Sequence, residues 1–388
     1  MKIHYSDKLM KLPPYLFIEI DKRKKEALNK GVDIISLGVG DPDLPTPAHI
    51  VQCMQEAVSN PENHKYPFGF GLIKYREAIA DWFQKRFDVS LELNEICALI
   101  GSKEGIGHMH LGFINKGDVV LVPEPGYPVY STATILTDGI PYFMPLLEKN
   151  NFLPDFSKIP SSVLTQAKII FINYPNNPTC AIANKEFYLE LINLAKKNNI
   201  IVAADAAYSE IYYDEQDKPC SFLELPGAKD VGVEFHSLSK TYNMTGWRIG
   251  WVCGNKDIIA GIAKVKDNYD SGVFQAIQEA GVVALSSSQQ AVYDLRKIYK
   301  ERRDLLVNGL QKMNWKVKLP KATFYVWAKV PTGYTSSDTV IKLLDEAGII
   351  CTPGNGMGNS GEGYVRFALT VNSSKIQEAL FRINKIQW

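Results

Sequence analysis

The most constraining feature of this sequence is a series of apolar strands that alternate with helices between Ile96 and Asn268. ICALIG, VVLVP and AKIIFIN are almost continuously apolar, and each is followed by a turn and a helical pattern. Strands that are apolar on both faces are typical of a mainly parallel sheet with helices on both sides. We therefore predict an α/β fold with a three-layer αβα large domain.

The C-terminal part of the sequence has a different pattern. A long helix is predicted from about Gln289 to Met313, after which strands such as IICTP and YVRFALT mix with shorter helices. This mixture indicates a smaller α+β domain. We predict an N-terminal arm with part of the small domain at 1–45, a large cofactor-binding domain at 46–286 and the small domain at 287–388.

Charge and cysteine content exclude several classes of protein. The sequence has 43 basic and 42 acidic residues, which gives no support for nucleic acid or an anionic membrane as a partner. Every apolar run is shorter than the roughly 18 residues of a membrane span, and we expect a cytoplasmic protein. The six cysteines form no CxxC pair, so we expect free thiols and no metal site.

Polar residues at the ends of the predicted strands mark a candidate active site. In a parallel sheet the ligand crevice lies beyond the carboxyl ends of the strands. Ser102, Tyr127, Asn177, Asp205 and Ser237 each follow a strand and are expected to converge there.

Lys240 lies in FHSLSKTYNMTGWRIG, directly after one of these strands. A lysine becomes a nucleophile toward carbonyl groups when burial or a neighbouring cation lowers its pKa. An isolated lysine is most often a solvated surface residue. The hydroxyls of Ser237 and Ser239 and the guanidinium of Arg248 make a phosphate site around a reactive lysine the stronger interpretation.

Asp205 ends the apolar strand IIVAAD, one strand–helix–strand unit before Lys240. A buried carboxylate needs a cation or several donors, and the ring nitrogen of a cofactor is one such partner. The alternative is a helix N-cap. Ser102 and Lys103 in GSKEG lie at a predicted helix start, where free backbone N–H groups suit a phosphate, although such turns also occur without a ligand.

Further aromatic, amide and guanidinium groups complete the candidate site. Tyr127 in EPGYP either covers a planar cofactor or is an ordinary packed aromatic residue. Asn177 in YPNNPT and Tyr208 can donate to a phenolic oxygen, although Asn-Pro is also a common turn pair. Arg366 lies inside YVRFALT, and its partner is either a substrate carboxylate or a structural one.

These motifs together resemble the fold-type I, pyridoxal-phosphate-dependent aminotransferases of class I and II over essentially the whole chain. The matching motifs are GSKE at 101–104, PGYP at 125–128, NNPT at 176–179, Asp205 with Tyr208, and SLSK with Arg248. The resemblance implies that Lys240 binds pyridoxal 5′-phosphate covalently and later moves the proton of the substrate's α-carbon. It also implies a ping-pong exchange between an amino acid and a keto acid such as 2-oxoglutarate.

The same resemblance implies a role for each remaining residue. Asp205 would pair with the pyridine nitrogen, Asn177 and Tyr208 with the phenolic oxygen, and Tyr127 would stack on the ring. Arg366 would bind the substrate α-carboxylate. The phosphate would be held by Ser102, Lys103, Ser237, Ser239 and Arg248, with Tyr66 from the partner subunit of a homodimer.

A narrower resemblance leads to the LL-diaminopimelate aminotransferases, which act in lysine biosynthesis on LL-2,6-diaminopimelate and tetrahydrodipicolinate. It rests on LPPYLF at 12–17, LGVGDPDLPTP at 37–47, HSLSKTYNMTGWRIG at 236–250 and DSGVFQAIQ at 270–278. The substrate contacts that it implies are Tyr15, Gly40, Lys103, Tyr127, Asn177 and Arg366.

The sequence differs from these relatives in two places. Cys180 stands where the family usually has glycine after Asn-Pro-Thr. Many relatives have an asparagine, supplied by the partner subunit, within 271–275, whereas Asn268 is the nearest asparagine here. The second difference bears on recognition of the far end of the substrate.

Three other functions remain open. Aminotransferases of the aspartate, alanine or aromatic type share the cofactor motifs, and so do carbon–sulfur β-lyases, which expel a leaving group. A non-catalytic regulator with this fold is normally fused to a basic helix-turn-helix segment, which we do not find before the arm. We therefore expect an enzyme.

Overall fold

The computed structural model describes residues 1–13, 16–29, 31–67 and 69–388. Within these residues the largest sheet has seven strands in the order β2-β8-β7-β6-β5-β3-β4. Neighbours among β3 to β7 pair in parallel, whereas β8 is antiparallel to β7 and β2. The strands are β2 (Ile96–Leu99), β3 (Val119–Glu124), β4 (Ile140–Pro145), β5 (Ala167–Asn173), β6 (Ile201–Asp205), β7 (Gly232–Ser237) and β8 (Gly250–Gly254). The predicted mainly parallel sheet is confirmed.

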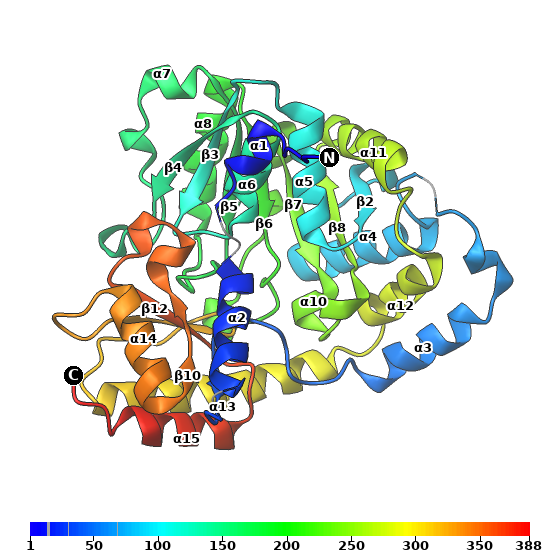
Figure 1. Cartoon of the computed structure of the whole chain (residues 1–388). Helices are drawn as coiled ribbons and strands as arrows, with labels where there is room; N and C mark the ends of the chain where they lie inside the picture. The colour runs from blue at the N-terminus through cyan, green and yellow to red at the C-terminus, as the bar shows by residue number, and fades with distance from the viewer. Residues whose placement is uncertain (14–15, 30, 68) are drawn as a thin grey trace.

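Both faces of this sheet are buried because its central strands have apolar side chains on both faces. In β5, Ile170 and Ile172 belong to one hydrophobic core, and Ile169 and Phe171 belong to another on the opposite face. Figure 1 shows helices on both sides of the sheet, which gives the three layers. The first core includes residues of α4 (Ile73–Phe87) and α8 (Lys185–Asn198), and the second includes residues of α5 (Ser102–Phe113), α6 (Val129–Leu136) and α11 (Lys256–Tyr269).

A second group of elements has its own core and a small antiparallel sheet in the order β11-β12-β9. These strands are β9 (Tyr325–Lys329), β11 (Thr352–Pro353) and β12 (Tyr364–Ala368). The long helix α13 (Gln290–Lys312) leads into this group, which also contains α14 (Ser336–Ala347) and α15 (Ser373–Ile383). The domain limits at 45 and 286 remain predictions.

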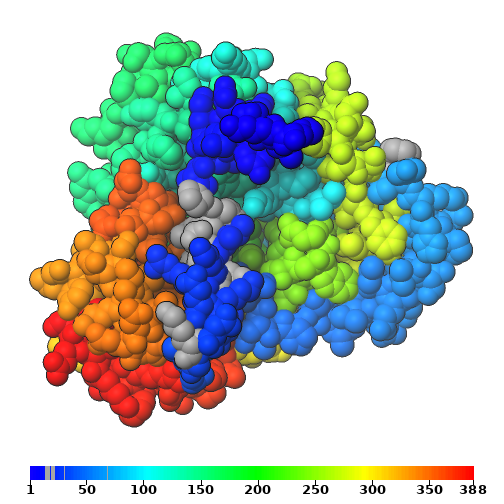
Figure 2. Space-filling model, in the orientation of Figure 1, coloured from blue at the N-terminus to red at the C-terminus, as the bar shows by residue number. Residues whose placement is uncertain are grey.

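The N-terminal segment contacts both parts of the molecule. Its strand β1 (Ile35–Ser36) pairs in parallel with β10 (Ile349–Ile350). Lys8 lies in α1 (Asp7–Met10), and its Nζ is 3.7 Å from Oδ2 of Asp138, a residue that directly follows α6. Figure 2 shows α1, in blue, over the green and cyan part that contains the large sheet, and α2 (Leu16–Asn29) nearer the orange part.

The sequence predicts long helices near 49–59, 73–87, 185–199, 256–268, 289–313 and 337–347, and the observed helices agree with them within one residue at each end. Besides α4, α8, α11, α13 and α14, this includes α3 (Ala48–Val58). A helix α12 (Gln275–Ser286) also precedes α13. None of the described helices is long and apolar enough to cross a membrane.

Candidate active site

A cavity of about 230 Å³ lies at the carboxyl ends of β5, β6 and β7. Asn173, Asp205 and Ser237 end these three strands, and the register places Asn173 beside Asp205. Most of the predicted residues line the cavity: Gly40, Ser102, Lys103, Tyr127, Asn177, Asp205, Tyr208, Ser237, Ser239, Lys240 and Arg248. The convergence expected from a parallel sheet is therefore observed.

Lys240 brings an amine into this cavity from the short helix α10 (Leu238–Thr241). Its Nζ donates a hydrogen bond to Gly40 O at 3.1 Å and lies 5.7 Å from the centre of the Phe324 ring. Burial lowers the pKa of Lys240 to about 8, an effect that the charge of Asp41 opposes and the charge of Arg248 adds to. A substantial neutral fraction near neutral pH makes this amine a nucleophile.

Asp205 faces the same cavity with one carboxylate oxygen satisfied and one not. Its Oδ2 accepts a hydrogen bond from Tyr130 Oη at 2.7 Å, whereas its buried Oδ1 has no hydrogen-bond partner among the described residues. Burial raises the pKa of Asp205, and the Tyr130 hydroxyl opposes that shift. A protonated ring nitrogen would supply the donor that Oδ1 lacks, so the site fits a pyridine-containing cofactor on this point.

The alternative interpretation of Asp205 as a helix cap is wrong. Residues 207–210 form turns, and no α-helix begins within the described residues that directly follow β6. Asn173 instead fixes the strand end, because its Nδ2 donates to Asp205 O at 2.8 Å.

A candidate anion site lies at the start of α5. Gly101 precedes this helix with φ 72°, and a Cβ there would overlap the guanidinium of Arg248. Ser237 caps α10 by accepting from Ser239 N at 3.1 Å. The first turn of a helix, nearby serine hydroxyls and a guanidinium together form a setting that suits a phosphate.

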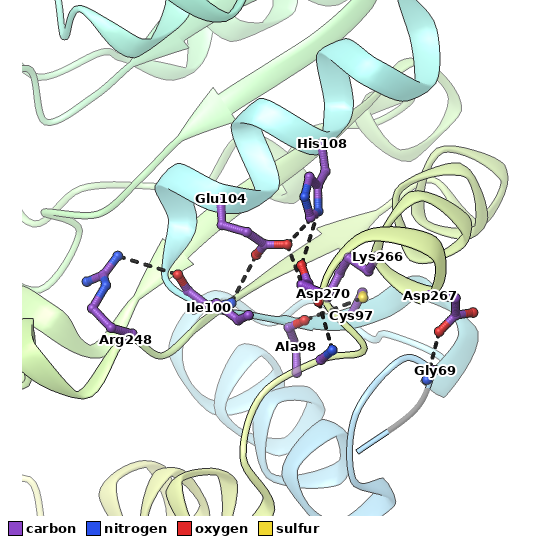
Figure 3. A network of polar contacts seen from close by, with 11 residues as sticks. Gly69, Cys97, Ala98, Ile100, Glu104, His108, Arg248, Lys266, Asp267 and Asp270 are labelled. Carbon is purple, nitrogen blue, oxygen red and sulfur yellow. Dashed lines mark hydrogen bonds and ion pairs between the residues drawn. The ribbon is translucent and has the colours of Figure 1, made fainter. Parts of the chain in front are cut away.

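A buried ion-pair network holds the first turn of α5 in place, as Figure 3 shows. Glu104 Oε2 accepts from Ile100 N at 2.9 Å, and its Oε1 lies 2.8 Å from Lys266 Nζ. Asp270 and His108 complete the group. Asp270 Oδ1 lies 3.2 Å from Lys266 Nζ, and His108 Nδ1 lies 2.6 Å from Glu104 Oε1. The spacing of Glu104, His108 and Asp270 would also suit a metal ion, but the Lys266 ammonium already lies against both carboxylates.

Arg366 is fully buried beside the cavity rather than in its lining. Its Nη1 donates to Asn177 Oδ1 at 2.7 Å, and its Nη2 donates to Gly38 O at 2.8 Å and to Thr352 Oγ1 at 3.2 Å. Asn177 therefore connects the guanidinium to the cavity, with its amide oxygen oriented toward Arg366.

Besides Arg366, one further predicted residue among those described, Tyr66, lies outside the cavity lining. Tyr66 lies just after the short helix η1 (Pro61–His64), is 74% exposed and does not line the cavity of its own chain. Its predicted role requires the partner subunit. Tyr15 lies outside the described residues.

The two differences from related sequences can also be located. Cys180 has φ 63°, the left-handed region that glycine adopts easily, and its Sγ lies 3.2 Å from Tyr325 O. Asn268 donates from Nδ2 to Lys264 O at 2.8 Å on the exposed side of α11. Its amide is thus engaged on its own helix.

The structure adds lining residues that the sequence did not indicate: Val39, Tyr130, Asn173, Ala207 and Tyr325. Asn173 is the last residue of AKIIFIN. It is a polar residue at a strand end, which is the same signal that indicated Asn177. Tyr130 lies three residues after Tyr127, in the first turn of α6. Its position near the cavity can therefore be inferred from that of Tyr127. Tyr325 comes from the other sheet, and no sequence signal connects it to the site.

Comparisons with known proteins agree with this geometry. A family model described as aminotransferase class I and II matches residues 32–383. The chain is 56% identical to the LL-diaminopimelate aminotransferase of Maridesulfovibrio salexigens over 98% of each chain, and 55% identical to that of Aquifex aeolicus over 99% of each. A substrate-bound structure of BacF from Bacillus subtilis is 38% identical, with a TM-score of 0.95 over 99% of this chain and 98% of that one.

Proposed function

Because the chain belongs to the class I and II aminotransferases, we propose that it transfers an amino group between LL-2,6-diaminopimelate and 2-oxoglutarate by a ping-pong mechanism. The observation that supports this substrate is the 56% and 55% identity, over nearly full length, to two LL-diaminopimelate aminotransferases. The keto product would be tetrahydrodipicolinate in its open form. A place in lysine biosynthesis and a cytoplasmic location follow from the same proposal.

The cofactor of this reaction would be pyridoxal 5′-phosphate. When bound, it supplies a ring that withdraws electrons from the substrate's α-carbon. Asp205 Oδ1 would hold the proton on the ring nitrogen, and Asn177 and Tyr208 would donate to the phenolic oxygen. Tyr127 would cover the ring. The phosphate would be bound by Ser102, Lys103, Ser237, Ser239 and Arg248.

Lys240 and Arg366 would act on the cofactor and the substrate. The Lys240 amine would bind the cofactor carbon covalently and, once the substrate's amino group has displaced it, would remove the proton from the substrate's α-carbon. Arg366 would bind the substrate α-carboxylate, since a guanidinium pairs with a carboxylate through two parallel hydrogen bonds. A homodimer would bring Tyr66 of each chain to the phosphate of the other, which agrees with its exposure in the single chain.

A panel of amino donors tests the proposed substrate. Protein saturated with pyridoxal 5′-phosphate is mixed with LL-diaminopimelate, aspartate, alanine or tyrosine, and loss of the visible absorbance of the bound cofactor is followed. We expect LL-diaminopimelate to react fastest and Lys240→Ala to abolish the visible band. A faster reaction with aspartate, alanine or tyrosine would instead assign one of the other aminotransferase types.

The same protein distinguishes amino transfer from β-elimination. Incubation with cystathionine should release no pyruvate beyond the background of Lys240→Ala. Pyruvate release faster than amino transfer from LL-diaminopimelate would identify a carbon–sulfur β-lyase and contradict the proposal.

A further inference from the structure

Tyr325 is the first residue of β9 and reaches the cavity from the small sheet. It is 3% exposed and lines the cavity, while its backbone is paired with Ala368 of β12. Its carbonyl oxygen lies 3.2 Å from Cys180 Sγ. The backbone of Tyr325 is therefore held on one side by the small sheet and on the other by the segment that contains Asn177 and Cys180.

The hydroxyl of Tyr325 contacts Tyr208, which follows β6 of the large sheet. The two Oη atoms are 3.0 Å apart, and their ring centres are 5.7 Å apart. Burial raises the pKa of both phenols, so each keeps its single proton. If Tyr325 donates to Tyr208, the proton of Tyr208 must be directed to another acceptor, and the cavity lies next to it.

The position of this hydroxyl is also fixed by Gly40. A Cβ at Gly40 would overlap Tyr325 Oη, so only glycine allows the loop to lie this close to the phenol. Gly40 O in turn accepts the hydrogen bond from Lys240 Nζ. The Tyr325 hydroxyl thus lies between Tyr208 and the loop that contacts the reactive lysine.

The ring of Tyr325 contacts a different functional group. The Cζ atom of Arg366 lies 4.2 Å from the centre of this ring, a distance typical of a cation–π contact. The ring therefore packs against the Arg366 guanidinium, which also donates a hydrogen bond to Asn177 Oδ1.

We propose that Tyr325 is a positioning residue for two parts of the site, with its hydroxyl orienting Tyr208 and its ring face orienting Arg366. The inference rests on the proposed function, in which Tyr208 donates to the cofactor and Arg366 binds the substrate carboxylate. It predicts that removing the hydroxyl and removing the ring have separable effects.

Two substitutions separate these effects. Tyr325→Phe keeps the ring and removes the hydroxyl, whereas Tyr325→Leu removes both. The matched control is Tyr364→Phe, because Tyr364 lies on the adjacent strand β12, stacks on Trp327 and does not line the cavity. The first readout is the pH midpoint of the visible absorbance of bound pyridoxal 5′-phosphate. The second is the L-glutamate concentration that half-saturates the loss of that absorbance.

For Tyr325→Phe we expect the absorbance midpoint to rise by roughly 0.5–1 pH unit, because a donor to the anionic oxygen of the cofactor is no longer oriented. The half-saturating glutamate concentration should stay within about twofold of wild type, since the ring remains. Tyr325→Leu should show the same absorbance shift and, in addition, a roughly tenfold higher half-saturating concentration. Tyr364→Phe should change neither readout.

An independent variant approaches the hydroxyl from its other side. Gly40→Ala should displace the hydroxyl and reproduce the absorbance shift of Tyr325→Phe. An unchanged midpoint in Tyr325→Phe, which differs from wild type by one oxygen atom, would overturn the inference even if Tyr325→Leu fails to fold. Wild-type protein that binds no pyridoxal 5′-phosphate would instead contradict the proposed function, so the two failures are distinguishable.

Discussion

Burial shifts the pKa values of two ionisable groups that line the cavity, the Lys240 amine and the Asp205 carboxyl. It lowers the pKa of Lys240 and raises the pKa of Asp205, and each shift favours the neutral form. Asp41 opposes the shift at Lys240, and the Tyr130 hydroxyl opposes the shift at Asp205. The cavity therefore favours the neutral, nucleophilic form of the Lys240 amine, while the Tyr130 hydroxyl favours the anionic form of Asp205 against the effect of burial.

The pKa of Lys240 predicts how fast cofactor attaches at each pH. Only the neutral amine attacks a carbonyl carbon, and the pKa of about 8 makes it the major form above about pH 8 rather than above the usual 10.5. The rate of absorbance change on mixing cofactor-free protein with pyridoxal 5′-phosphate should rise about tenfold per pH unit below this value and then level off. A rate that continues to rise to the usual pKa of lysine would contradict the assignment.

Tyr130→Phe tests the support of Asp205. Loss of the 2.7 Å hydrogen bond leaves Asp205 Oδ2 without its donor, which should raise the pKa of the carboxyl further and cost about 1–3 kcal/mol of unfolding free energy. Urea denaturation of the cofactor-free protein measures this loss. Affinity for pyridoxal 5′-phosphate should also fall, since a neutral carboxyl group pairs less strongly with a protonated ring nitrogen than a carboxylate does. Tyr127→Phe, which leaves the Tyr130–Asp205 bond intact, is the control for the unfolding measurement.

Residues with a local signal could be predicted from the sequence, and residues without one could not. Lys240, Asp205 and Arg248 lie in short motifs at strand ends, and the structure brings all three to one cavity. Tyr130 and Tyr325 were missed because their importance depends on partners far away in the sequence. Tyr130 donates a hydrogen bond to Asp205, and Tyr325 contacts the hydroxyl of Tyr208. Both contacts form only after the chain has folded.

At the scale of elements, α5 depends on charges that another helix supplies. Lys266, on α11, is 1% exposed and lies against Glu104 and Asp270. Burial alone would raise the pKa of Glu104, but hydrogen bonds from His108 and the charge of Lys266 lower it to about 2. The stabilisation is therefore complete above the usual pKa of 4.5 and is lost as the pH falls toward 2.

Lys266→Met should destabilise the protein and loosen the anion site. Breaking one side of a buried ion pair leaves uncompensated carboxylates, which costs about 3 kcal/mol or more of unfolding free energy. Affinity for pyridoxal 5′-phosphate should fall as well, because Glu104 holds Ile100 N just before the first turn of α5. Lys264→Met, on the exposed side of the same helix, is the matched control and should change neither quantity. Equal effects of both substitutions would show that the network has no special role.

The predicted long helices agree with the observed ones within one residue because their signals lie within each segment. Apolar periodicity defines α4 and α8, and Asn184 caps the start of α8 by accepting a hydrogen bond from Phe187 N. The pairing of β1 with β10 had no such signal, because β1 has a single apolar residue and β10 has only two. It joins segments at opposite ends of the chain, and only tertiary packing selects that partner.

For the whole molecule, the loop that contains Gly40 connects the long helix α13 to the site. Arg302 of α13 donates from Nη1 and Nη2 to the two oxygens of Asp43 at 2.7 and 2.9 Å. Arg302 Nη1 also donates to Leu369 O at 2.9 Å, just after β12. Three segments that are distant in the sequence thus meet at one guanidinium, which fixes the loop against the small sheet.

Arg302→Met should release this loop without affecting the proposed phosphate site, whose expected donors lie on α5, α10 and the segment before β8. We therefore expect an unchanged affinity for pyridoxal 5′-phosphate and a several-fold rise in the KM for the amino acid, because Gly40 and Gly38 lie in the released loop. Asp43→Asn should have a smaller effect, since an amide can still accept one of the two hydrogen bonds. Lys297→Met, at an exposed position of the same helix, provides the baseline. A loss of cofactor affinity equal to the change in KM would mean that Arg302 supports the fold as a whole rather than the loop.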